Sequence, residues 1–75
     1  MTTKEKVTLV EQARKLYTLG LTLENYRQEI RRLVHQNIPY DSPQMKDAVF
    51  QFQTTEEEWT RLEQEYLEYR QSLFS

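Results

Sequence analysis

A seven-residue spacing of large side chains runs through the second half of the chain. Two sets of positions carry this spacing: Met45, Phe52, Trp59, Tyr66 and Leu73, and, three residues after the first four of these, Ala48, Thr55, Leu62 and Tyr69. This is the a/d pattern of a coiled coil, in which one side of a long helix forms an apolar seam. Because a seam needs a second helix to cover it, the spacing predicts a protein that works by contact.

The length of 75 residues allows one small helical domain, residues 1–75. A single Gly, two Pro and abundant Gln, Glu, Leu and Arg favour helix throughout, so the predicted fold class is all-α. A chain this short often needs a disulfide, a metal or a second subunit for stability. The absence of cysteine excludes disulfides and cysteine-based metal sites, which leaves oligomerisation.

The first half predicts a short antiparallel hairpin of two helices, over about residues 3–19 and 22–36. Thr2 and Glu5 have the spacing of a capping box at the start of the first helix. Gly20 suits the left-handed residue that ends many helices, and Thr22 suits the N-cap of the next helix. Pro39 disfavours helical geometry at Ile38, so the second helix is expected to end near residue 37.

Ser42 and Pro43 predict the start of a long amphipathic helix over about residues 43–73. Thr54 or Thr55 could cap a new helix, so a kink or break there is an alternative. The seven-residue phase nevertheless runs unbroken from Phe52 to Trp59, which favours one continuous helix.

The predicted lengths leave part of the long helix uncovered. A hairpin about 25 Å long covers only part of a helix about 45 Å long. We therefore expect the C-terminal half of the seam to bind a second copy or another helical protein, and the predicted partner interface is Trp59, Leu62, Tyr66, Tyr69 and Leu73. A break at Thr54–Thr55 would instead give a compact four-helix monomer.

Charge is divided between the two halves. Residues 1–40 hold seven basic and four acidic residues, a net +3, and residues 41–75 hold three basic and eight acidic residues, a net −5. The opposite net charges of the two halves favour packing of one half on the other, within the chain or between two copies. Arg27, Arg31 and Arg32 form a candidate basic patch for nucleic acid. The patch is small and the acidic half would repel nucleic acid, so nucleic acid is not the expected partner.

No pattern of catalytic residues is present. His35 is the single histidine, and Glu56, Glu57 and Glu58 are consecutive, so their side chains diverge around a helix. We expect no enzyme activity, no catalytic residues, no metal, no cofactor and no small-molecule substrate. No segment has the features of a signal peptide or a membrane span, so the expected location is the cytoplasm and no membrane partner is expected.

Residues 13–27, Ala-Arg-Lys-Leu-Tyr-Thr-Leu-Gly-Leu-Thr-Leu-Glu-Asn-Tyr-Arg, resemble the helix–Gly–helix segment that precedes the dimerising coil of MerR-type transcription regulators. The resemblance implies a dimerisation module rather than a DNA reader, because the DNA-binding part of that family has no counterpart here. The sequence thus predicts a non-enzymatic interaction module, an adaptor or regulator that forms a homodimer or binds a partner helix. The alternative is a small nucleic-acid-binding transcriptional regulator that uses the Arg27/Arg31/Arg32 face.

Overall fold

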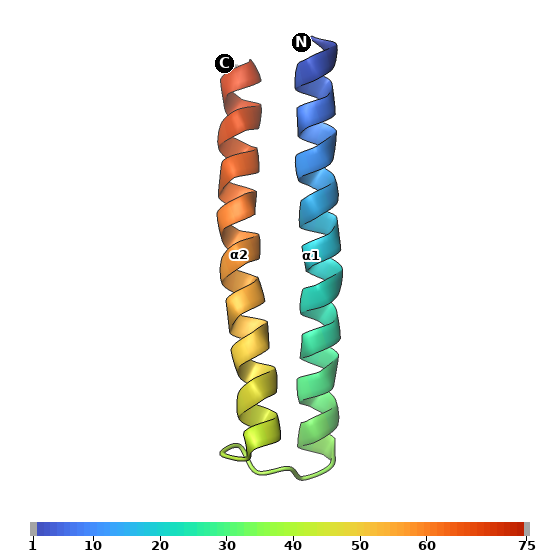
Figure 1. The fold of residues 1–75 in the computed structure, drawn as a ribbon, viewed down its shortest axis with the longest axis vertical. Coiled ribbons are helices and arrows are strands. Elements are labelled where there is room, and N and C mark those ends of the chain that lie inside the picture. Colours follow the sequence, from blue (N-terminus) through green and yellow to red (C-terminus); the bar gives the residue numbers. More distant parts are fainter. Residues whose placement is uncertain (1, 75) are drawn as a thin grey trace.

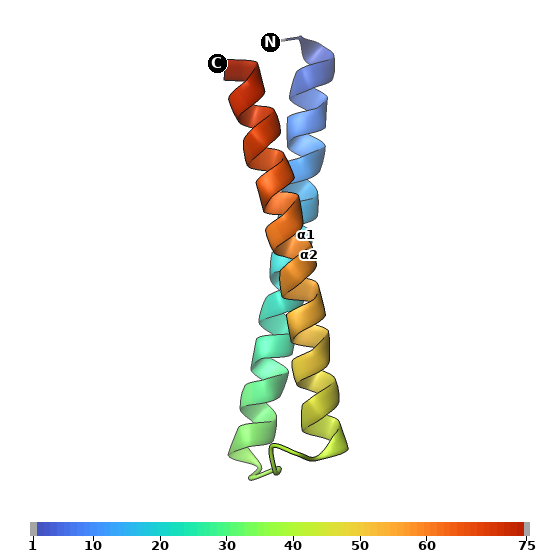
Figure 2. The same ribbon diagram turned by 90° about the vertical axis from the view of Figure 1, so that its left-hand side faces the viewer.

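The computed structural model describes residues 2–74, which form two helices joined by one short connection. Helix α1 spans Thr3–His35 and helix α2 spans Pro43–Phe74. They lie side by side and antiparallel, with both chain termini at one end and the connection at the other (Figure 1). The hairpin measures 53 × 14 × 14 Å, and its helices are inclined to each other (Figure 2). The prediction of an all-helical fold is confirmed over the described residues.

The start of α1 is capped as predicted. The Thr2 Oγ1 atom accepts the Glu5 backbone N–H at 3.2 Å, and the Thr2 hydroxyl donates to the Glu5 carboxylate at 3.1 Å. The first contact satisfies one of the backbone donors that a helix start leaves without an intrahelical partner. Glu5 also places negative charge near the positive end of the helix dipole.

The end of α1 is a complete Schellman motif. Asn37 takes the left-handed conformation (φ 59°), its N–H donates to the Val34 carbonyl, and the Ile38 N–H donates to the Leu33 carbonyl, both at 3.0 Å. Ile38 packs against the buried cluster that includes Leu33, and an apolar contact of this kind often accompanies the motif. The predicted end of the helix near residue 37 is therefore confirmed.

The connection leads directly into α2. The Ser42 N–H donates to the Pro39 carbonyl at 3.1 Å, and the Ser42 Oγ atom accepts the Met45 N–H at 3.2 Å. Ser42 is thus the N-cap and Pro43 the first helical residue, where a missing N–H costs nothing. The predicted helix over 43–73 is confirmed. It runs without interruption through Thr54 and Thr55, where a break was the alternative.

The predicted break at Gly20–Leu21 is wrong, and with it the arrangement of a short hairpin on a longer helix. Helix α1 is continuous across residues 19–22, and Gly20 does not have a positive φ. The Thr22 hydroxyl donates to the Thr18 carbonyl at 3.2 Å, four residues back, so Thr22 sits inside a helix and caps nothing.

Tertiary packing explains why the helix continues. Spacings of three and four residues run through α1 without a change of phase, at positions that are all at least partly buried: Glu5, Leu9, Gln12, Leu16, Leu19, Leu23, Tyr26, Ile30 and Leu33. A glycine inside a helix costs about 0.5–1 kcal/mol. Burial of the leucines on both sides of Gly20 outweighs that cost, since each contributes roughly 1.5–3 kcal/mol when fully buried.

The two helices meet along one seam. All nine a/d positions identified in α2 are buried or partly buried, as the seven-residue spacing predicts. The best-packed part lies near the connection, where Leu33, Met45 and Ala48 are no more than 6% exposed. Because α1 and α2 have nearly equal lengths, α1 covers the α2 seam to its end, and the expected uncovered half of that seam is absent.

We predict that Gly20→Ala stabilises the protein by about 0.5–1 kcal/mol, since alanine removes the glycine penalty inside a helix. A Cβ atom at this position would lie 3.8 Å from Trp59 Nε1, which is ordinary van der Waals contact. Urea unfolding followed by circular dichroism at fixed protein concentration measures the change. A helix that ended in a left-handed Gly20 would instead lose stability, so the sign of the effect tests the continuous helix.

Candidate functional site

The seam has two open sides, and they differ in chemistry. On one side, a groove is lined by Gly20, Arg27 and neighbouring residues of α1 and by Glu56, Trp59 and Thr60 of α2. On the other side, Lys15 and Thr18 of α1 face Glu58 and Leu62 of α2. In an antiparallel pair the seven-residue repeat keeps each set of helix positions on the same side along the whole length. Each side therefore forms a continuous face of the hairpin.

The side that carries Gly20 and Arg27 gathers exposed apolar residues. We call it the apolar face and define it by Val10, Tyr17, Val34, Val49, Leu67 and Phe74. Tyr17 is 69% exposed and Phe74 is 65% exposed, and Val49 alone among the six is partly buried. Val7, Leu21 and Phe50 are also exposed, at positions of each helix that point away from the seam.

The opposite side, which we call the polar face, has no apolar side chain among the described residues. Its positions on α1 are Lys4, Thr8, Glu11, Lys15, Thr18, Thr22, Asn25, Glu29 and Arg32, and those on α2 are Asp47, Gln51, Thr54, Glu58, Arg61, Glu65, Glu68 and Ser72. Among the described residues, five of the nine large apolar side chains with the greatest exposure lie on the apolar face, and none lies on the polar face. Exposed apolar residues that gather on one face are typical of an interaction site.

Trp59 forms the floor of the groove on the apolar face. Its Nε1–H donates to the Leu16 carbonyl at 3.1 Å, across the seam. A carbonyl oxygen has two lone pairs, so Leu16 can accept the indole in addition to the bond within its own helix. Gly20 makes room for the indole ring, since no side chain covers the carbonyl from that position.

The five residues predicted to form a partner interface all lie in the seam. Trp59, Leu62, Tyr66, Tyr69 and Leu73 are partly buried, and they face α1 rather than empty space. The premise that this half of α2 is bare is therefore wrong, because α1 is one long helix. Trp59 alone combines this packing with a place in the groove on the apolar face.

The apolar face was not identified from the sequence, although a signal exists. Four residues of this face come directly after a seam residue at the a position of the heptad: Val10, Tyr17, Leu67 and Phe74. Within each helix, the two residues are seven positions apart. Such residues widen the apolar side of a helix beyond one seam. Their meaning depends on the direction of the neighbouring helix, since only an antiparallel hairpin places both sets on one face.

The three arginines of the candidate basic patch lie on two faces: Arg27 and Arg31 are one turn apart on the side of the apolar face, and Arg32 is on the polar face. Arg27 donates to the Glu24 carboxylate at 3.1 Å and lies 5.8 Å from the centre of the Phe52 ring. Arg32 pairs with Glu29, with its Nε–H 3.0 Å from the carboxylate. Arg27 borders the apolar face, whereas Arg32 lies on the polar face. Two of the three positive charges are thus partly neutralised within the helix.

The hydrogen bond from Arg32, with a smaller contribution from its charge, lowers the pKa of Glu29 below its ordinary value. A carboxyl group whose pKa falls on folding stabilises the folded state above its unfolded pKa and loses that contribution as the pH falls through the folded value. We predict that an NMR titration gives a pKa for Glu29 below the ordinary value of a glutamate. Arg32→Gln should move it back toward the ordinary value, and an unchanged midpoint in that variant would contradict the pairing.

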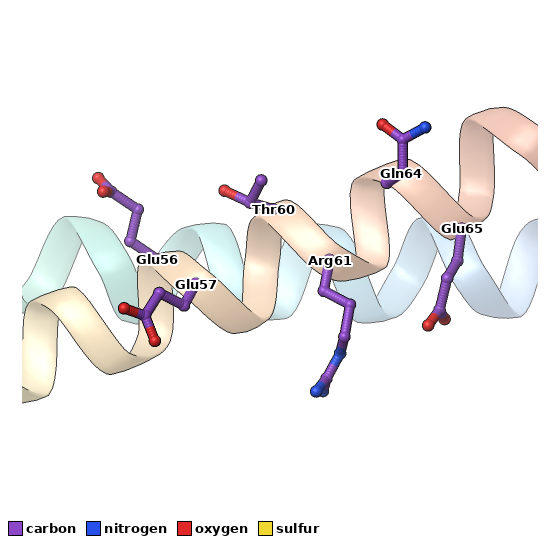
Figure 3. A pocket seen from close by; sticks show the side chains of 6 residues that line it. All are labelled: Glu56, Glu57, Thr60, Arg61, Gln64 and Glu65. Atoms are coloured by element: carbon purple, nitrogen blue, oxygen red, sulfur yellow. The ribbon is translucent and has the colours of Figure 1, made fainter.

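The acidic segment of α2 does not form a closed site. Six residues line a shallow depression on this helix alone: Glu56, Glu57, Thr60, Arg61, Gln64 and Glu65. Glu57 and Glu65 project to one side and Glu56 and Gln64 to another (Figure 3). Across the described residues, no three His, Asp or Glu side chains converge as metal ligands, and His35 is an exposed residue at the end of α1. Neither described helix has the length and apolar character needed to cross a membrane.

Comparison with known proteins adds no relative: no protein-family model, curated protein or solved structure gives a significant match to the chain. The segment that resembles MerR-type regulators is also not a helix–Gly–helix junction, since residues 13–27 lie within α1. The geometry of the hairpin is therefore the basis for any functional proposal.

We predict that Trp59→Phe destabilises the protein by about 1–2 kcal/mol, because it removes the hydrogen bond to Leu16 and part of the buried ring. Trp59→Ala should cost about 3–5 kcal/mol, as expected for truncation of a large packed aromatic residue. Thr60→Ala is the matched control on the exposed surface beside it and should change stability by less than about 0.5 kcal/mol. Thermal unfolding followed by circular dichroism measures all three, and equal effects at positions 59 and 60 would contradict the assigned role of Trp59.

Proposed function

We propose that this chain is a non-enzymatic protein-interaction module, an adaptor or regulator, and that the apolar face is its contact surface. The observation that carries the proposal is the division of the hairpin into one face with exposed apolar side chains and one face with polar side chains only. The proposal also keeps the cytoplasmic location expected from the sequence.

The composition of the apolar face supports contact with protein. Tyr17 and Phe74 are large and exposed, and tyrosine is enriched at the residues that contribute most to binding energy. Arg27 lies on the same face, further toward the connection, and arginine is also enriched among the residues that contribute most to binding. A partner helix placed on this face would cover the groove above Gly20 and Trp59.

The seam residues take a different role from the one expected from sequence. Leu62, Tyr66, Tyr69 and Leu73 hold α2 against α1, and so fix the direction in which Leu67 and Phe74 project. Trp59 does the same and also forms the floor of the groove. A partner therefore meets the side of the seam and not the seam itself.

The nucleic-acid alternative has weaker support. Its three arginines are divided between two faces, and carboxylates pair with Arg27 and Arg32. A protein that binds many phosphates needs several free positive charges on one surface.

A photo-crosslinking amino acid tests the contact surface in living cells. We predict that benzoylphenylalanine at position 17 on the apolar face forms crosslinks to polypeptide, because an exposed aromatic residue there meets the partner. The matched control is position 18, the neighbouring residue on the polar face, which should give few or no crosslinks. Crosslinking of nucleic acid at position 17, equal yields at both positions, or no product at position 17 would contradict the proposal.

A further inference from the structure

We propose that the occupant of the apolar face is a second copy of this chain, stacked face to face with the first with both connections at the same end. Two hairpins then form a four-helix bundle. This inference rests on the proposed function, since it names the partner for the same surface. Three observations carry it: the exposed area, the level of the apolar residues along the hairpin, and the charge of the two helices.

The exposed area exceeds that of a folded monomer of this mass. The accessible surface is 5973 Å² for a chain of 9.2 kDa, whereas compact monomers of that mass expose about 4,900 Å². The excess is about 1,000 Å², and a standard interface buries about 800 Å² on each partner. One further hairpin of the same size supplies the missing cover.

The buried core lies at one end of the hairpin. The three least exposed of the described residues, Leu33, Met45 and Ala48, lie toward the connection. At the other end the seam includes Gln12, whose buried Oε1 atom has no hydrogen-bond partner. The exposed Val10 and Leu67 lie at that same end, so a second copy would add apolar burial where the hairpin has least.

The positions of Val10 and Leu67 along the long axis of the hairpin favour one of the two possible two-fold arrangements. Trp59 bonds to Leu16, and in the same antiparallel register Val10 lies level with Leu67. A two-fold axis parallel to the helices leaves each residue at the same position along the long axis of the hairpin. It also places α1 of one copy over α2 of the other. Val10 of one copy therefore meets Leu67 of the other. The other two-fold arrangement reverses the levels and places Val10 near Arg27 of the second copy, which lies on the same face.

Charge favours the same arrangement. Helix α1 carries seven basic and four acidic residues, a net +3, and α2 carries three basic and seven acidic residues, a net −4. On the side of the apolar face, α1 carries Lys6, Arg27 and Arg31 against Glu24, a net +2, whereas the charges of α2 on that side balance: Lys46, Glu56, Glu63 and Arg70. With connections at opposite ends, α1 would pack on α1 and bring two positively charged surfaces together, and the arrangement with both connections at one end avoids this.

Single cysteines test the arrangement, because the chain has none of its own. Val10→Cys is mixed with Leu67→Cys in one sample and with Arg27→Cys in another, under mild oxidation. A disulfide requires Cα atoms within about 7 Å, so intact mass spectrometry of the mixed product reports which residues meet. The first pair should give several-fold more heterodimer than the second. Glu11→Cys with Glu68→Cys, at the same level on the polar face, is the matched control and should give little product.

Sedimentation equilibrium of the unmodified chain completes the test. A dimer is expected, and Tyr17→Glu with Leu67→Glu should convert it to a monomer that keeps its helical circular dichroism. Lys15→Glu with Glu65→Lys on the polar face should leave the dimer unchanged. A strict monomer at high concentration, or a dominant pair of positions 10 and 27, would overturn the inference. In that case, crosslinks from position 17 to a different polypeptide would still support the proposed function. A monomer that also gives no crosslinks from position 17 would contradict both the dimer and the proposed function.

Discussion

Two helices that touch along one line cannot bury much of each other, and this limit shapes the rest of the molecule. Each α-helix is a cylinder about 10–12 Å wide, of which one seam covers a narrow strip. Among the described residues, three fall below one-tenth exposure, although α1 and α2 pack from end to end. An apolar residue outside the seam therefore stays in water unless something other than this hairpin covers it. The position of such residues is the main clue to what the chain does.

The hairpin depends on one close fit at its centre. Trp59 is the largest residue in the seam, and it lies opposite Gly20, which has no side chain. The indole donates to the backbone carbonyl of Leu16 on the other helix. This hydrogen bond links one level of α2 to one level of α1 and so helps to set the register of the two helices. The same absence of a side chain leaves a groove on the apolar face.

Local signals in the sequence predict every helix end that depends on local contacts. Thr2 with Glu5, Ser42 with Pro43, and Pro39 act within a few residues, and the structure confirms each of them. Gly20 followed by Thr22 has the same local signature and was misread, because packing against α2 over the whole length of α1 decides that position. The correct signal was the continuous spacing of Leu16, Leu19 and Leu23. The error then changed the predicted site, since a broken α1 would have left Trp59 to Leu73 uncovered.

The polar face limits how far association can proceed. A two-fold contact uses the same surface on both copies, so once two apolar faces meet, neither remains available. Association of further copies would require a second apolar surface on the outside of the dimer. The polar face lies on that outside. Its described positions carry hydroxyl, amide and charged side chains, and the charges are of both signs. Such a surface keeps its water, because covering it would leave polar groups without partners. One apolar face and one polar face therefore lead to a closed pair of hairpins and not to a fibre.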